Sequence, residues 1–136
     1  MKRLLTLATL AILVSAPARA DLPPELQAKF VKIICSNAGS AGKVAVKDAT
    51  MSAKLGEAGV APDAAAKVAY AGSEAEIASY KGKLIICPKL EWLPKGGSIA
   101  IVEEGGKPAI YLHMQNIGAS GVTLSDAVMK IGKPAK

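Results

Sequence analysis

The stretch KVAYAGSEAEIASYKGKLIIC, residues 67–87, decides the fold class, because it has the pattern of a strand, a helix and another strand. Lys67–Ala71 predicts the first strand. Ser73, with Glu76 three residues later, forms the capping box of a short helix. Lys83–Cys87 predicts the second strand, and its consecutive Leu-Ile-Ile residues indicate burial on both faces. Burial on both faces is typical of a strand in a parallel sheet.

Upstream of this stretch, the alternation of strands and helices continues. Residues 43–47 predict a strand, and residues 50–57 predict a helix that stops before Gly59. An earlier amphipathic helix is expected to begin near Pro24 and to end in the cluster at residues 37–40. Strands that alternate with helices predict parallel pairing with right-handed crossovers. The apolar face of that first helix is expected to consist of Leu26, Phe30, Ile33 and Ile34.

Downstream, the pattern changes to a hairpin and a last helix. Ser98–Val102 and Ala109–His113 predict two strands around the pair Gly105-Gly106, which indicates antiparallel pairing. A helix is expected from Thr123, followed by a frayed tail around Pro134. The expected fold is therefore α/β: a small mixed sheet of parallel strand–helix units and an antiparallel hairpin, with helices on both faces. The buried stripe of the last helix is expected to contain Leu124, Val128 and Ile131.

The first twenty residues have the three parts of a secretory signal peptide. They are the charged start Met1–Arg3, the apolar run Leu4–Val14 and the small-residue end Ala18–Ala20. A retained membrane anchor is the less favoured interpretation, because a spanning helix needs about 20 apolar residues. We expect cleavage after Ala20 and a periplasmic protein with no direct membrane insertion. Residues 21–136 are expected to form one domain.

The charge of the exported chain argues against nucleic acid as a partner. Lys2, Arg3 and Arg19 leave with the signal peptide, so 17 basic residues become 14 against 11 acidic ones, a net charge of +3. No arginine remains, and arginine is the usual bidentate ligand of phosphates and guanine edges. The lysines are scattered singly, which is typical of a solvated surface. We therefore expect no binding of nucleic acid.

Two cysteines, Cys35 and Cys87, leave two alternatives open. In an oxidising compartment they can form one disulfide, which would contribute about 4 kcal/mol in the chain-entropy model. Against this, one lies at the end of a predicted helix and the other at the carboxyl end of a predicted strand, which favours opposite ends of the sheet. A disulfide needs Cα atoms within about 7 Å. The other alternative is two buried free thiols.

Metal and catalytic chemistry find no support in the sequence. His113 is the single histidine, and Met114 beside it would point to the opposite face of a strand, so the two would not converge on one ion. The chain has no Gly-x-Ser-x-Gly, phosphate-loop or His-Glu-x-x-His motif. Cys87 with His113 as its base would lack an orienting third group. We therefore expect no enzyme, no cofactor and no metal site.

Trp92, with its neighbours Glu91 and Lys95, is the candidate contact for a partner or ligand. It is the only tryptophan and follows a strand that we expect to be parallel, and ligands gather after such strands in α/β sheets. Exposed tryptophan is also enriched in binding hot spots. The alternative is an aromatic cap over the edge of the sheet, since large aromatic side chains are usually mostly buried.

Several segments together resemble the YfiR-like family of small bacterial periplasmic proteins. They are Glu91–Ile99, the Gly-Lys-Pro of residues 106–108, the Gly-Val-Thr-Leu of residues 121–124 and the Met-Lys-Ile of residues 129–131. The chain departs from the family at His113-Met114, where many members have an Asn-Leu pair. It is also shorter between residues 51 and 67, where relatives often fit another strand. The resemblance implies a regulator of an inner-membrane signalling protein, a diguanylate cyclase or a sensor kinase. It also implies a redox-responsive pair of cysteines.

The first hypothesis is therefore a periplasmic regulatory protein that acts by protein contact. The rival is a carrier of a small ligand that resembles one lobe of a periplasmic binding protein. Its site would lie at the carboxyl ends of the strands, near residues 87–92. A third hypothesis, a redox enzyme, requires a thiol of low pKa.

Overall fold

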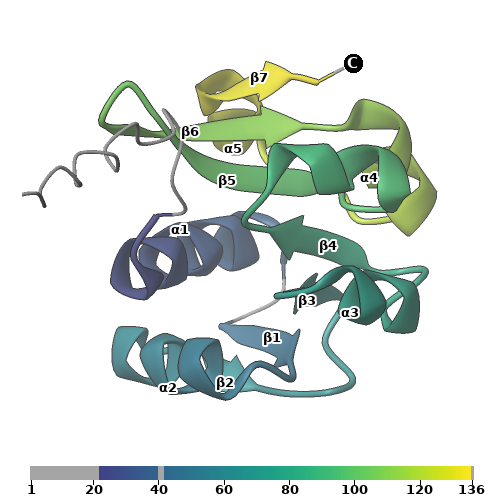
Figure 1. The fold of residues 1–136 in the computed structure, drawn as a ribbon. Coiled ribbons are helices and arrows are strands. Elements are labelled where there is room, and N and C mark those ends of the chain that lie inside the picture. The colour runs from purple at the N-terminus through teal and green to yellow at the C-terminus, as the bar shows by residue number, and fades with distance from the viewer. Residues whose placement is uncertain (1–21, 40–41, 136) are drawn as a thin grey trace, which may run out of the picture.

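The computed structural model describes residues 22–39 and 42–135, so the predicted signal peptide and its cleavage point lie outside the described residues. Seven strands form one sheet in the order β2-β1-β3-β4-β5-β6-β7 (Figure 1). The helices are α1 (Pro24–Asn37), α2 (Ala49–Ala58), α3 (Glu74–Ser79), the 3₁₀ helix η2 (Leu90–Lys95), α4 (Met114–Ser120) and α5 (Asp126–Ile131). The strands are β1 (Lys43–Val46), β2 (Ala61–Pro62), β3 (Val68–Tyr70), β4 (Leu84–Cys87), β5 (Ile99–Glu104), β6 (Lys107–Leu112) and β7 (Gly132–Pro134).

The sheet is mixed, as the sequence predicted. All neighbours from β2 to β5 pair in parallel. The hairpin of β5 and β6 is antiparallel and turns at Gly105-Gly106, where both glycines have positive φ. β7 then pairs in parallel with β6. The α/β class, the buried strand predicted at Lys83–Cys87 and the hairpin are thus confirmed.

The two faces of the sheet differ in side-chain size, because successive residues of a strand point to opposite sides. One face, here the aliphatic face, packs against α1, α2 and α5 (Figure 1). The other, the alanine face, packs against α3 and η2. Small side chains on that second face let these short helices approach closely. The aliphatic face contains Val44, Val68, Tyr70, Leu84, Ile86, Ile99, Ile101, Ile110 and Leu112. The alanine face contains Ala45, Ala69, Ala71, Ile85, Cys87, Ala100 and Val102.

Local capping signals explain where the helices begin. The carboxylate of Asp48 accepts a hydrogen bond from Thr50 N at 3.0 Å and caps α2. Ser73 Oγ accepts from Glu76 N at 3.3 Å and caps α3, as predicted. The Glu76 carboxylate accepts from Gly72 N at 2.9 Å, one residue before the position that the standard capping box uses.

Three details of the first and last helices differ from the prediction. Ile131, expected in the buried stripe of the last helix, is 53% exposed. Ile33 is 43% exposed, because α1 turns Gln27, Val31 and Ile34 toward the sheet instead. The last helix begins at Asp126 and its N-cap is Ser125, two residues after the expected Thr123. The reason is tertiary: Ser125 Oγ donates a hydrogen bond to Asn37 Oδ1 at 2.7 Å, so the cap residue is tied to the end of α1.

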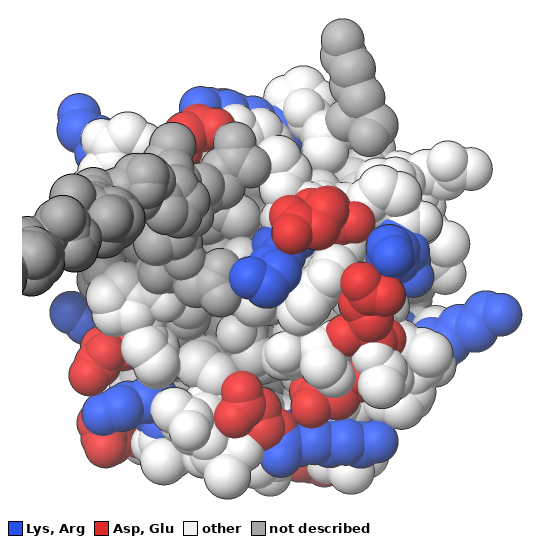
Figure 2. Space-filling model, viewed as in Figure 1, with Lys and Arg blue, Asp and Glu red and all other residues white. Residues whose placement is uncertain are grey.

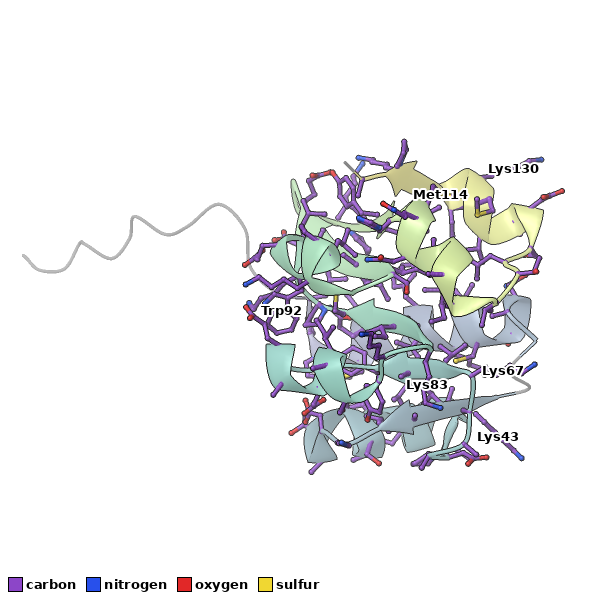
Figure 3. All side chains as sticks on the ribbon, turned by 90° about the vertical axis from the view of Figure 1, so that its right-hand side faces the viewer. Lys43, Lys67, Lys83, Trp92, Met114 and Lys130 are labelled. Atoms are coloured by element: carbon purple, nitrogen blue, oxygen red, sulfur yellow. The ribbon has the colours of Figure 1, made fainter. Side chains whose placement is uncertain are left out.

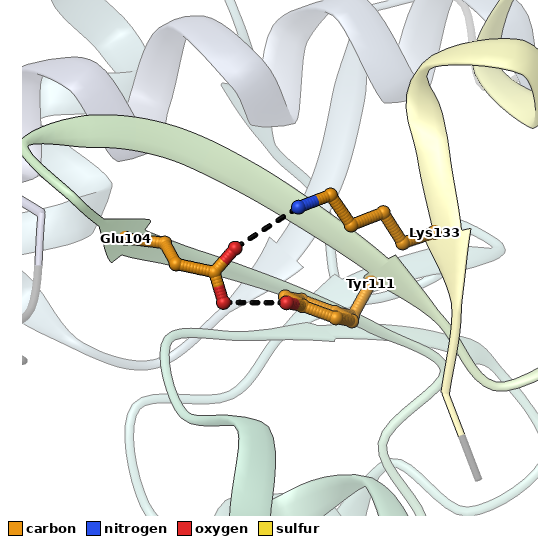
Figure 4. Close-up of polar contacts among 3 residues, drawn as sticks. All are labelled: Glu104, Tyr111 and Lys133. Carbon is orange, nitrogen blue, oxygen red and sulfur yellow. Dashed lines mark hydrogen bonds and ion pairs between the residues drawn. The ribbon is translucent and has the colours of Figure 1, made fainter.

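The segment after the hairpin also differs from the prediction. His113 is not in a strand: it caps α4, a helix that we did not predict, and its Nδ1 accepts from Asn116 N at 3.2 Å. The expected frayed tail is ordered as β7. Figure 4 shows what holds it: Glu104 accepts hydrogen bonds from Tyr111 at 2.5 Å and from Lys133 at 3.0 Å. Lys133 Nζ also lies over the Tyr111 ring, and its bond to Glu104 raises the pKa of Lys133.

Gly132, the first residue of β7, gives a test of this docking. A Cβ at that position would lie 2.5 Å from Leu112 Cγ, far inside van der Waals contact. We expect Gly132→Ala to lower the free energy of unfolding by about 1–3 kcal/mol, the usual cost of overpacking. Urea denaturation measures it. The control is Gly118→Ala in α4, where a Cβ meets nothing within 4 Å, and this variant should be at least as stable as the parent. Equal stability of the two variants would contradict the packing of β7.

Candidate functional site

A groove of about 410 Å³ opens beside the alanine face, between α3, η2 and α4. We call it the lysine groove, because every charged residue in its lining is a lysine. Figure 3 faces this side of the molecule, with Lys83 near the centre of the view. The lining consists of Ile77, Ala78, Lys81, Gly82, Lys83, Ile85, Lys95, Gly96, Asn116, Ala119 and Ser120.

The floor of the lysine groove is apolar and depends on a glycine. Ile77 of α3 and Ile85 of β4 are both buried there. Gly96 has φ +126, and a Cβ at this position would lie 3.0 Å from Ile77 Cγ2. Any other residue at position 96 would have a strained backbone, and its side chain would crowd the floor of the groove. The groove therefore combines a narrow apolar base with polar, basic rims.

The three lysines differ in how they are held. Lys83 Nζ donates to Ala66 O at 2.6 Å, so Lys83 has a structural role at the rim. Lys95 forms an ion pair with Glu74 at 3.2 Å, with both side chains about half exposed. Within the part of the chain that the structure describes, Lys81 forms no hydrogen bond or ion pair. The groove thus carries an uncompensated positive charge that would attract an anionic partner.

Asn116 fixes the α4 wall of the groove. Its side-chain amide donates to Leu93 O and to Gly97 O, both at 2.9 Å, and so ties α4 to η2 and to the loop before β5. Its backbone N–H is capped by His113. One asparagine therefore connects three elements that are up to 23 residues apart in sequence. The wall is preorganised, so a partner need not order it on binding.

The predicted contact residues only partly meet at this groove. Lys95 lines it, whereas Glu91 is exposed on η2 and Trp92 does not line it. Trp92 is half-buried and packs against both apolar clusters of the alanine face, with Lys89 Nζ 5.9 Å from its ring centroid. The structure thus places Trp92 as a cap over the sheet. Lys81, Lys83 and Asn116 were missed, because no sequence motif marks residues brought together by a tertiary groove.

The structure contains Cys35 and Cys87 as free thiols, the second of the two alternatives. Cys35 packs with α1 on the aliphatic face, whereas Cys87 points to the alanine face together with Ile85. The two thiols therefore lie on opposite faces of the sheet, and no disulfide joins them in this structure. Burial raises the pKa of Cys35 to about 11 and that of Cys87 to about 12. These shifts are opposite to the low pKa that a nucleophilic thiol requires.

Metal-ligating side chains do not gather anywhere in the described ranges. Among residues 22–39 and 42–135, no group of three or more His, Cys, Asp or Glu side chains could hold an ion. His113 is occupied as the N-cap of α4, and Met114 is the first residue of that helix, 48% exposed. Figure 2 shows acidic and basic side chains interspersed on the face seen there.

Comparisons with known proteins add the fold and no more. Over the described residues, no helix has the length and apolar character to cross a membrane. No family model matches the chain, and no curated protein matches it. A solved structure described as a conserved domain protein from Vibrio cholerae O1 biovar El Tor is similar, with a TM-score of 0.59 and 12% identity. The match covers 86% of this chain and 62% of the Vibrio chain, so this chain spans less than two thirds of that neighbour. The likeness is one of α/β fold.

Proposed function

We propose that the chain is a periplasmic, non-enzymatic regulatory protein of the YfiR-like type. It acts by contact with an inner-membrane signalling protein, a diguanylate cyclase or a sensor kinase. The observation that carries the proposal is the lysine groove, a preorganised site with an apolar floor and a basic rim on which Lys81 has no partner among the described residues. The resemblance of residues 91–99, 106–108, 121–124 and 129–131 to the family supplies the class of partner.

The chemistry of the groove favours an acidic segment of the partner. Lys81 and Lys95 are exposed at the rim, so a carboxylate can approach them without the large desolvation cost of a buried pair. An apolar side chain of the same segment can cover Ile77 and Ile85 on the floor. Exposed charges of this kind mainly speed association and set specificity. Binding should therefore weaken as ionic strength rises.

Charge reversal at the rim tests the proposal. Lys81→Glu with Lys95→Glu turns two attractive charges into repulsive ones and leaves Lys83, which has a structural hydrogen bond, in place. In-cell crosslinking of the tagged protein, followed by mass spectrometry, should recover one inner-membrane cyclase or sensor kinase with the parent chain. Recovery with the variant should fall about tenfold or more, a change of about 1.4 kcal/mol in binding.

The matched control reverses two lysines on the other side of the molecule. Lys29 on α1 and Lys130 on α5 are exposed and do not line the lysine groove, and Lys130 is labelled in Figure 3. Lys29→Glu with Lys130→Glu changes the net charge by the same amount and should leave recovery unchanged. Recovery of abundant envelope proteins alone, or an equal loss in both variants, would contradict contact through the lysine groove.

A further inference from the structure

A second crevice opens at the carboxyl ends of the parallel strands, away from the lysine groove. From β1 the chain passes through α2 to β2 on one side of β1, and β3 then lies on the other side. The helix after β1 covers the aliphatic face, and the helix after β3 covers the alanine face. The loop after β1 and the loop after β3 therefore lead to opposite faces of the sheet. The position between β1 and β3 is the topological switch point, where open α/β sheets bind ligands. A crevice of about 380 Å³ lies there.

Gln27 is among the residues that line this crevice, and its side chain has an unpaired acceptor. Its side chain is 2% exposed, and its Nε2 donates to Ile101 O at 2.8 Å. Its Oε1 is buried and has no hydrogen-bond partner among the described residues. Rotating the amide by 180° would set Oε1 against the Ile101 carbonyl, so the orientation is fixed by that bond. A buried acceptor without a donor is costly, and a small donor that enters the crevice and reaches Gln27 Oε1 would remove that cost.

Asp48 contributes a second acceptor, which is charged. One carboxylate oxygen caps α2 through Thr50 N. The other oxygen, Oδ2, lies beside Gly72. A Cβ on residue 72 would come within 2.9 Å of Oδ2, so a glycine at this position keeps the carboxylate uncrowded. Met51, Pro24 and Pro88 supply apolar walls to the same crevice. The site therefore offers hydrogen-bond acceptors, one negative charge and an apolar lining.

From this arrangement we infer that the crevice binds a small primary amine in its ammonium form. The ammonium group donates to Gln27 Oε1 and to the Asp48 carboxylate, and the alkyl chain lies against Met51, Pro24 and Pro88. A neutral alcohol satisfies the acceptors without the charge, and a carboxylate is repelled by Asp48. This site is separate from the lysine groove, so it adds a small-ligand function to the proposed regulatory one.

The probes are butylamine and 1,4-diaminobutane, with butanol and butyrate as neutral and anionic controls. Each is titrated at pH 7 against the whole exported protein, and the melting temperature is measured. A ligand that binds only the folded state raises the melting temperature with its concentration. We expect a saturable rise with the amines and none with butyrate. No rise with either amine at tens of millimolar, or an equal rise with butanol, would overturn the inference.

Two variants locate the site. Asp48→Asn keeps a residue that caps helices well and removes the charge, so amine affinity should fall about tenfold while stability stays close to that of the parent. Asp63→Asn is the control, because Asp63 is an aspartate outside the crevice that also bonds a backbone N–H two residues on. An equal fall in both variants would overturn the site. Lys81→Glu with Lys95→Glu should bind amines normally, which separates this inference from the proposed function.

Discussion

Raising the pH from 8 to 11 is expected to lower the free energy of unfolding by about 5 kcal/mol through the two buried thiols alone. In the unfolded chain both thiols ionise near pH 9, whereas in the fold the pKa of Cys35 is about 11 and that of Cys87 about 12. Both pKa values are raised, so their contribution to stability is present in full below pH 9. This contribution is lost as the pH rises from 9 toward 11 for Cys35 and toward 12 for Cys87. The loss is about 1.4 kcal/mol for each pH unit and each thiol.

Urea denaturation at a series of pH values, under reducing conditions, measures this loss. Lysine and tyrosine side chains also titrate in this range, so the comparison is with Cys35→Ala combined with Cys87→Ala. The double variant should start from a lower stability at pH 8, because two core side chains are shortened. Between pH 9 and 11 its stability should fall much less steeply than that of the parent. Parallel curves would show that the thiols are not buried as described.

The second large effect is expected from Asn116→Asp, which changes one atom of the side chain. The amide of Asn116 donates to Leu93 O and Gly97 O, and a carboxylate in its place would set negative charge against both carbonyls. Two hydrogen bonds would be lost and two partly buried acceptors would be left unpaired. We expect a loss of about 2–4 kcal/mol in the free energy of unfolding at pH 7.

A neighbouring substitution controls for the added charge. Gln115→Glu places a carboxylate on the exposed face of the same helix, α4, and should change stability by less than about 0.5 kcal/mol. Below the pKa of the new carboxyl group the Asn116→Asp variant should recover part of its stability, because the protonated acid can donate one hydrogen bond. If both variants were equally stable at pH 7, Asn116 would not be the link between α4 and η2.

The parts of the fold that the sequence predicted are those with local signals. Consecutive apolar residues located β4, the glycine pair located the turn of the hairpin, and Ser73 located the start of α3. The parts that it missed depend on contacts between distant residues. α4 is capped by a histidine, an unusual cap, and β7 is held by a lysine that reaches back to Glu104.

The candidate sites were less predictable than the fold, again for tertiary reasons. Strand alternation alone places Cys87 with Ile85 and apart from Ile86, but the sequence does not state which face α1 covers. Without that fact, the choice between disulfide and free thiols stayed open. Lys81 and Asn116 are 35 positions apart, and only the tertiary fold, which places the turn after α3 and the helix α4 along one groove, brings them together.

The most direct test of contact through the lysine groove is site-specific photo-crosslinking in cells. A photoreactive residue replaces Ala78 on one wall or Ala119 on the other, both exposed and both lining the groove. Ala127, exposed on α5, carries the same residue as the control. We expect both groove positions to crosslink to one inner-membrane signalling protein and the Ala127 position not to crosslink to it. Crosslinks to that protein only from Ala127, or from none of the three, would contradict it.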